Sequence, residues 1–100
     1  MTLLIVGTIR LAPDRVDDAR PVMARMVSAS RAEDGCLAYS YAEDMLDRGL
    51  VHVIERWRDH ASLERHFATD HLAAWREAWP ALGLGERDLA LYEVGDPRAV

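Results

Sequence analysis

Residues 36–57, CLAYSYAEDMLDRGLVHVIERW, decide the fold. Both ends of this stretch carry the alternating, β-branched and aromatic side chains that favour strands. Segment 44–49 between them is polar and ends in glycine, so the sequence predicts a hairpin of strands 36–43 and 50–57. One side of the first strand is expected to carry Leu37, Tyr39 and Tyr41. One face of the second strand is expected to carry Val51, Val53, Glu55 and Trp57.

The segments on either side of the hairpin predict further elements. Residues 2–11, TLLIVGTIRL, favour a strand, and a helical stretch follows from Pro13-Asp14 to about Asp34. Pro21 inside that stretch predicts a kink or a late helix start, and Gly35 is expected to end the helix. After the hairpin, Asp59 can cap a helix that runs to Phe67, and Thr69 or Asp70 can cap a second helix that runs to Trp79. Pro80 and the glycines at 83 and 85 are expected to end the second helix, and residues 89–94 favour a fourth strand.

This order of elements predicts an α+β fold with the ferredoxin-like split β-α-β-β-α-β arrangement and an antiparallel sheet. We expect a single domain at residues 1–95 and a tail at 96–100 without periodicity. Helices can cover only one face of such a sheet, and the other face also carries apolar side chains. A homodimer packed sheet against sheet would cover that second face.

Charge and composition narrow the function. The chain has 17 acidic and 12 basic residues, a formal net charge of −5, which argues against nucleic acid and anionic membranes as partners. Cys36 is the only cysteine, so no internal disulfide can form. The first ten residues have neither a basic lead-in nor a long apolar run, which favours a cytoplasmic location over export.

Cofactor and metal motifs are absent. The chain has no G-x-G-x-x-G, P-loop, C-x-x-C or H-E-x-x-H pattern, so we expect neither a cofactor nor a metal. His66 and His71 are the nearest pair of metal-ligand type. Their spacing of five residues is not expected to bring two imidazoles together on one helix, and no third ligand is evident.

Histidine and tryptophan are concentrated in one region. All four histidines and all three tryptophans lie between residues 52 and 79. They predict an aromatic cleft with titratable imidazoles, suited to a flat aromatic ligand. Simpler roles stay open: Trp75 and Trp79 as helix packing, His52 at a dimer interface or in the core, and Glu55 in an ion pair with an arginine.

Several short patterns resemble one known family. EDGCLxY at 33–39, ERW at 55–57, and ASLxxHF at 61–67 followed by DH at 70–71 are similar to the antibiotic biosynthesis monooxygenase domain family. The resemblance implies a dimeric α+β barrel with one cleft per subunit, and it places Trp57 and His66 at cleft positions. The haem-degrading branch of that family uses a first-strand asparagine, whereas this chain has Gly7-Thr8 there and no asparagine at all.

The sequence therefore predicts a cofactor-independent monooxygenase that oxidises a small quinol, phenol or polyketide-like ring with O₂. His66 or His71 is expected to act as the base, and Trp57 to contact the ring or its oxygen. Two alternatives are a cofactor-free isomerase acting on a small carbonyl metabolite and a non-catalytic dimer that binds a small aromatic. The residues expected to bind substrate are Tyr39, Glu55, Phe67, Trp75 and Arg76.

Overall fold

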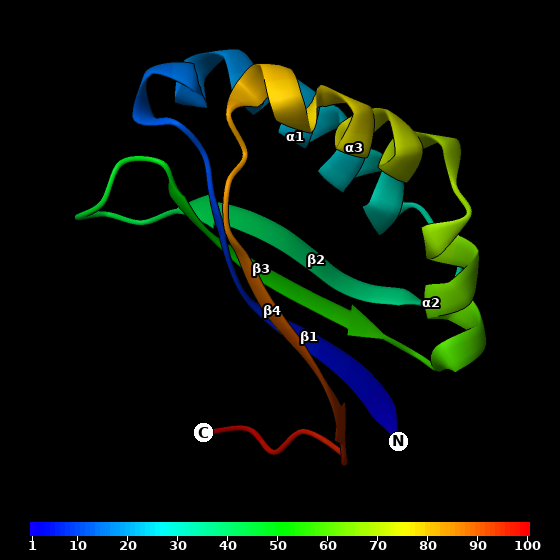
Figure 1. Cartoon of the computed structure of the whole chain (residues 1–100). Coiled ribbons are helices and arrows are strands. Elements are labelled where there is room, and N and C mark those ends of the chain that lie inside the picture. Colours follow the sequence, from blue (N-terminus) through cyan, green and yellow to red (C-terminus); the bar gives the residue numbers. More distant parts are fainter.

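Four strands form one antiparallel sheet in the computed structural model, which describes all of residues 1–100 (Figure 1). They are β1 (Thr2–Arg10), β2 (Cys36–Glu43), β3 (Leu50–Trp57) and β4 (Arg87–Val94), in the order β2-β3-β1-β4. β3 lies between β1 and β2, and β1 between β3 and β4, which is the split β-α-β arrangement. The predicted hairpin and the predicted α+β ferredoxin-like fold class are confirmed.

Two of the three helices cover one face of this sheet, and the third lies at its end (Figure 1). α1 (Val16–Arg31) follows a short 3₁₀ turn, η1 (Pro13–Arg15), and packs beside α3 (Asp70–Leu82). α2 (His60–Phe67) lies at one end of the sheet, between β3 and α3 in the chain. None of the helices combines the length and apolar character needed to cross a bilayer.

Side-chain caps separate α2 from α3. Asp59 accepts a hydrogen bond from the Ser62 backbone N–H at 2.8 Å and begins α2. Thr69 accepts one from the Leu72 N–H at 3.4 Å and begins α3, so the chain turns between the two helices. The predicted cap at Asp59 is confirmed, and of the two candidates for α3, Thr69 is the cap.

Two helix boundaries differ from the prediction. α1 begins at Val16 and continues through Pro21, so a late start after that proline is wrong. α3 does not end before Pro80 but runs to Leu82, because Gly83 adopts a left-handed conformation (φ 65°) and caps the helix there. Leu82 is thereby buried in the core.

The core lies between the helices and the inner face of the sheet. The alternation expected for β3 is confirmed, and β1 alternates in the same way, since the inward side chains of both strands are buried in the core. The buried residues of β1 and β3 are Leu3, Ile5, Ile9, Val51, Val53, Glu55 and Trp57. Glu55 is the only acidic residue among the buried ones and is 6% exposed.

One strand departs from simple alternation. The register of β2 against β3 shifts between Cys36 and Ala38, as at a β-bulge. Leu37 is consequently 48% exposed, whereas Tyr39 is buried. The expectation that Leu37 shares a side with Tyr39 is wrong, because the irregularity interrupts the two-residue period at that point.

The outer face of the sheet carries exposed apolar side chains. Val6, Ile54 and Tyr92 are 37%, 47% and 54% exposed. Val6 pairs with Ile54 across β1 and β3, and Tyr92 of β4 pairs with the β1 residue two positions before Val6. Helices α1 and α3 cover the opposite face. The sheet-to-sheet homodimer stays a prediction.

Gly35 connects α1 to β2 and offers a test of this architecture. Its φ is +87°, and a Cβ there would collide with the Ser62 side chain at the start of α2. We expect Gly35→Ala to lower the free energy of unfolding by about 1–3 kcal/mol in urea denaturation. Gly85→Ala is the matched control, because nothing lies within 4 Å of that position, and it should stay within about 0.5 kcal/mol of wild type. Equal stability of the two variants would contradict this account.

Candidate active site

A cavity of about 200 Å³ lies between the inner face of the sheet and helices α2 and α3. Its wall is mostly apolar and aromatic, with a few polar side chains, as in small-molecule sites. Six of the eight predicted site residues line it, whereas Trp57 and His71 do not. The six are Tyr39, Glu55, His66, Phe67, Trp75 and Arg76.

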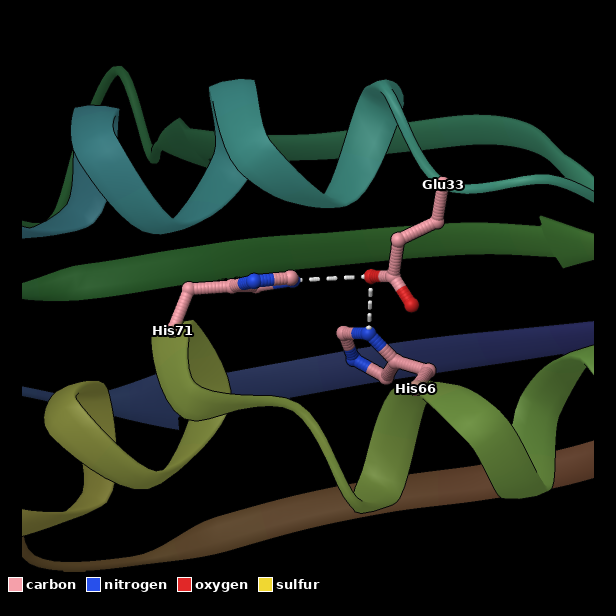
Figure 2. Close-up of side chains that lie close together, drawn as sticks. All are labelled: Glu33, His66 and His71. Carbon is pink, nitrogen blue, oxygen red and sulfur yellow. Dashed lines mark hydrogen bonds and ion pairs between the residues drawn. The ribbon is translucent and has the colours of Figure 1, made fainter.

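His66 is the polar centre of the site. Its ring is buried, 1% exposed, and Nδ1 lies 2.6 Å from Oε2 of Glu33 (Figure 2). A carboxylate can only accept hydrogen bonds, so this contact assigns the proton to Nδ1 and leaves a lone pair on Nε2. Nε2 lies 3.5 Å from the hydroxyl oxygen of Tyr39, at the cavity wall. The arrangement holds a neutral imidazole whose basic nitrogen faces the Tyr39 hydroxyl at the cavity wall.

Glu33 also accepts from a second imidazole. Nε2 of His71 lies 2.9 Å from the same oxygen, and Figure 2 shows both rings pointing at it. The expectation that His66 and His71 cannot meet is wrong. They stand on different helices, α2 and α3, and the turn capped by Thr69 brings them to one side. Thr69 donates its hydroxyl to the His66 carbonyl at 2.7 Å, which helps hold that turn.

The same three residues form the set of metal-ligand type in this chain. Oε2 of Glu33, Nδ1 of His66 and Nε2 of His71 lie within 4.8 Å of one another. Two imidazoles and a carboxylate can hold a divalent transition metal. In the structure the carboxylate oxygen is shared between two imidazole nitrogens by hydrogen bonds. The absence of a metal stays a prediction.

Burial sets the protonation of the site. Desolvation lowers the pKa of His66, and the hydrogen bond to Glu33 opposes this shift. Desolvation likewise raises the pKa of Tyr39 far above its ordinary value, so its hydroxyl stays protonated and can donate. The pKa of Glu55 is raised by burial, with the indole of Trp57 opposing the shift. The wall therefore favours a neutral imidazole beside a protonated phenol.

Trp57 stands behind the cavity. It is 0% exposed, and its indole nitrogen donates to Oε1 of Glu55 at 2.9 Å. Its ring centroid lies 4.7 Å from that of His66. Direct contact between Trp57 and a substrate is therefore not supported, and its side chain positions Glu55 and His66 instead. The arginine partner considered for Glu55 is absent too: its hydrogen bond comes from this tryptophan, and no arginine lies within ion-pair distance.

The structure also places the other residues considered for the site. His52 is exposed and lies 2.7 Å from Asp44, so within this chain it is not a core residue. Trp75 is 2% exposed and both fills the core and lines the cavity. Sequence reasoning missed Glu33 and Arg87. Of these two, Arg87 lies at the cavity wall. Glu33 was visible as the first residue of the EDG pattern, but nothing in the sequence alone links it to the two histidines.

The comparisons with known proteins agree with this fold and site. The sequence profile described as antibiotic biosynthesis monooxygenase matches residues 2–78. The chain therefore belongs to the antibiotic biosynthesis monooxygenase family, as the resemblance of its motifs predicted.

Individual relatives are more distant. The uncharacterized protein sll1783 of Synechocystis is 26% identical over 98 residues, which is 98% of this chain and 67% of that protein. Rv0793 of Mycobacterium tuberculosis is 33% identical over 64 residues, 64% of this chain and 62% of that protein. The chain thus spans about two thirds of the length of these relatives. The crystal structure of PA3566 from Pseudomonas aeruginosa is 33% identical, with a TM-score of 0.80 over 97% of this chain and 95% of that one.

Glu55 allows a test of the buried electrostatics. An acid whose pKa is raised on folding binds more protons in the native state, so its contribution to stability falls as pH rises from about its ordinary value, 4.5, through the raised value. Glu55→Gln removes the buried charge and keeps an oxygen for the Trp57 indole. We expect it to raise the free energy of unfolding by roughly 1 kcal/mol at pH 8 and by much less at pH 4. Urea denaturation across this pH range measures the difference.

The exposed Glu64 on α2 supplies the control. Glu64→Gln should stay within about 0.5 kcal/mol of wild type at every pH. A Glu55→Gln effect that does not change with pH would show that the charge of this carboxyl group is not what destabilises the native state.

Proposed function

We propose that this protein is a cofactor-independent monooxygenase that oxidises a small phenol or quinol with O₂. The observation that carries the proposal is the buried His66 ring at the wall of an aromatic cavity, with Nδ1 held by Glu33 and Nε2 3.5 Å from the Tyr39 hydroxyl oxygen. This is the geometry of a general base that a carboxylate orients and whose imidazolium form it stabilises. Membership of the antibiotic biosynthesis monooxygenase family supports the reaction type.

The chemistry needs a base because O₂ has a triplet ground state and reacts slowly with closed-shell molecules. His66 Nε2 takes the proton of a substrate hydroxyl, and the resulting phenolate passes one electron to O₂. The substrate radical and superoxide then pair, forming a C–O bond at a ring carbon, and the imidazolium returns its proton to the peroxide. Loss of the C–H proton from that carbon cleaves the O–O bond. Water leaves, and a new carbonyl remains on the ring, so one quinol and one O₂ give one hydroxyquinone and one water.

The size of the cavity limits the substrate. An engineered apolar cavity of about 150 Å³ binds benzene. The present cavity, about 200 Å³, is thus suited to one aromatic ring with small substituents. It is below the roughly 300 Å³ at the lower end of drug-sized sites, which disfavours a tetracyclic substrate.

The rings around the cavity contribute positioning and desolvation. Tyr39 stacks on Tyr41 with ring centroids 5.7 Å apart, and Tyr41 meets the edge of Trp75 at 6.1 Å. These rings present flat apolar surfaces to an aromatic substrate. Exclusion of water strengthens the interaction of Glu33 with the imidazolium that forms during proton transfer.

Oxygen uptake with isotope labelling tests the proposed reaction. The protein, treated with a chelator, is given a one-ring quinol and ¹⁸O₂, with a protein-free blank to correct for autoxidation. We expect one O₂ consumed per quinol, one ¹⁸O atom in the hydroxyquinone and the other in water. Hydrogen peroxide as the stoichiometric product would contradict the proposal. Proton exchange into a carbonyl substrate without oxygen uptake would replace it with the isomerase alternative.

Glu33→Gln tests the role of the oriented base. The amide can donate to Nδ1 of His66 through its NH₂ group, which favours the tautomer that carries the proton on Nε2. We expect the oxidation rate to fall by about 10²–10⁴-fold, the usual contribution of a general base. The measurement is the initial rate of oxygen uptake, with circular dichroism to check folding.

Glu64→Gln is again the matched control, because this exposed glutamate on α2 lies outside the cavity wall. Its rate should equal that of wild type. If Glu33→Gln and Glu64→Gln oxidise the quinol at the same rate, His66 is not a base that Glu33 orients.

A further inference from the structure

The geometry points to a subsite for an anionic group at the end of the cavity formed by α3 and β4. The inference rests on the proposed function and narrows it: the substrate is a hydroxylated aromatic ring that carries a carboxylate. Donor groups of three side chains lack a protein acceptor and gather at this end. They belong to Arg76, Trp79 and Arg87.

Arg76 and Arg87 are uncompensated cations in an acidic protein. Six of the twelve arginines form ion pairs within 4.0 Å, namely Arg10, Arg15, Arg20, Arg48, Arg58 and Arg65. Arg76 and Arg87, both exposed, belong to the other six, which form none, and they are the only two of those six at the cavity wall. Both line the cavity, one from α3 and one from the first residue of β4. A cavity wall that keeps two guanidinium groups free of carboxylates favours an anionic ligand.

Trp79 holds the two arginines and adds a third donor. The guanidinium carbon of Arg87 lies 4.6 Å from the centroid of the Trp79 ring, and that of Arg76 lies 6.0 Å from it. The indole nitrogen of Trp79 is buried and has no hydrogen-bond partner. Buried donors are nearly always paired in proteins, so this orphan N–H points to an acceptor that the chain itself does not supply. A carboxylate supplies acceptors and a negative charge at once.

The donors and the base stand apart along the cavity. Ring contacts run in succession from Trp79 through Trp75, Tyr41 and Tyr39 to His66. A single ring with a hydroxyl group on one side and a carboxylate opposite presents one group to each of these two ends. The hydroxyl group then faces His66 Nε2, and the carboxylate faces the arginines.

Other anions fit less well. A cavity of about 200 Å³ is too small for a nucleotide or a lipid. Its aromatic lining would leave an inorganic anion without contacts over most of its surface, whereas an aromatic acid uses both the rings and the guanidinium groups. The ligand class is therefore an aromatic carboxylic acid with a hydroxyl group across the ring.

The test compares 3,4-dihydroxybenzoate with its methyl ester, which has the same ring and hydroxyl groups but no charge. Each is titrated without oxygen into the full chain, and binding is followed by tryptophan fluorescence and calorimetry. We expect the acid to bind at least about tenfold more tightly than the ester, because only the carboxylate makes charge-assisted hydrogen bonds. Equal affinities, or tighter binding of the ester, would overturn the inference.

Variants test which residues cause the preference for the acid over the ester. In Arg76→Gln/Arg87→Gln the ratio of acid to ester affinity should fall to about one. Arg25→Gln is the matched control, because Arg25 is an exposed arginine of α1 without an ion pair and outside the cavity, and its ratio should stay at the wild-type value. A preference that persists in the double variant, or that disappears in the control, would contradict the assignment.

The outcomes separate this inference from the proposed function. Arginine-dependent binding of the acid without oxygen uptake would leave the anion subsite standing and overturn the monooxygenase. Oxidation of neutral quinols by a protein that shows no preference for the acid would support the monooxygenase and overturn the anion subsite.

Discussion

The hydrogen bond between Glu33 and His66 is the contact on which the site depends. At 2.6 Å it sets the tautomer of a buried imidazole and supplies the charge that stabilises the imidazolium form. Three features of the fold bring the partners together: α1 ends just before Glu33, Gly35 turns the chain into β2, and the Thr69 cap separates α2 from α3. A small change in any of these would move the carboxylate or the ring. The geometry of the site therefore depends on where the helices begin and end.

The cavity has a polarity that follows from the sheet order. β2 and β3 contribute Tyr39, Tyr41 and Glu55 to its wall, whereas the edge strand β4 contributes Arg87. One end thus holds a basic nitrogen and a phenol, and the other holds guanidinium groups. This asymmetry orients a ring whose substituents differ. The orientation decides which ring oxygen meets the base.

Much of the fold could be predicted from the sequence, because strand alternation and helix caps are local. The buried faces of β1 and β3, the hairpin and the caps at Asp59 and Thr69 all follow from neighbouring residues. Leu37 was misplaced because a bulge depends on the pairing strand. The site was only partly predictable, since its members meet through tertiary packing: Glu33 is 33 residues from His66, and the broken helix that unites His66 with His71 is invisible to a spacing rule. Trp57 was correctly expected to share one face of β3 with Glu55, but residue type alone could not place it behind the cavity.

Nitrogen NMR of the His66 ring tests the central claim most directly. In uniformly ¹⁵N-labelled protein at neutral pH, two-bond correlations between ring protons and ring nitrogens distinguish Nδ1 from Nε2 and report which of them is protonated. The account predicts a neutral ring with the proton on Nδ1 and an unprotonated Nε2. A ring protonated on Nε2 alone, or an imidazolium at that pH, would contradict it.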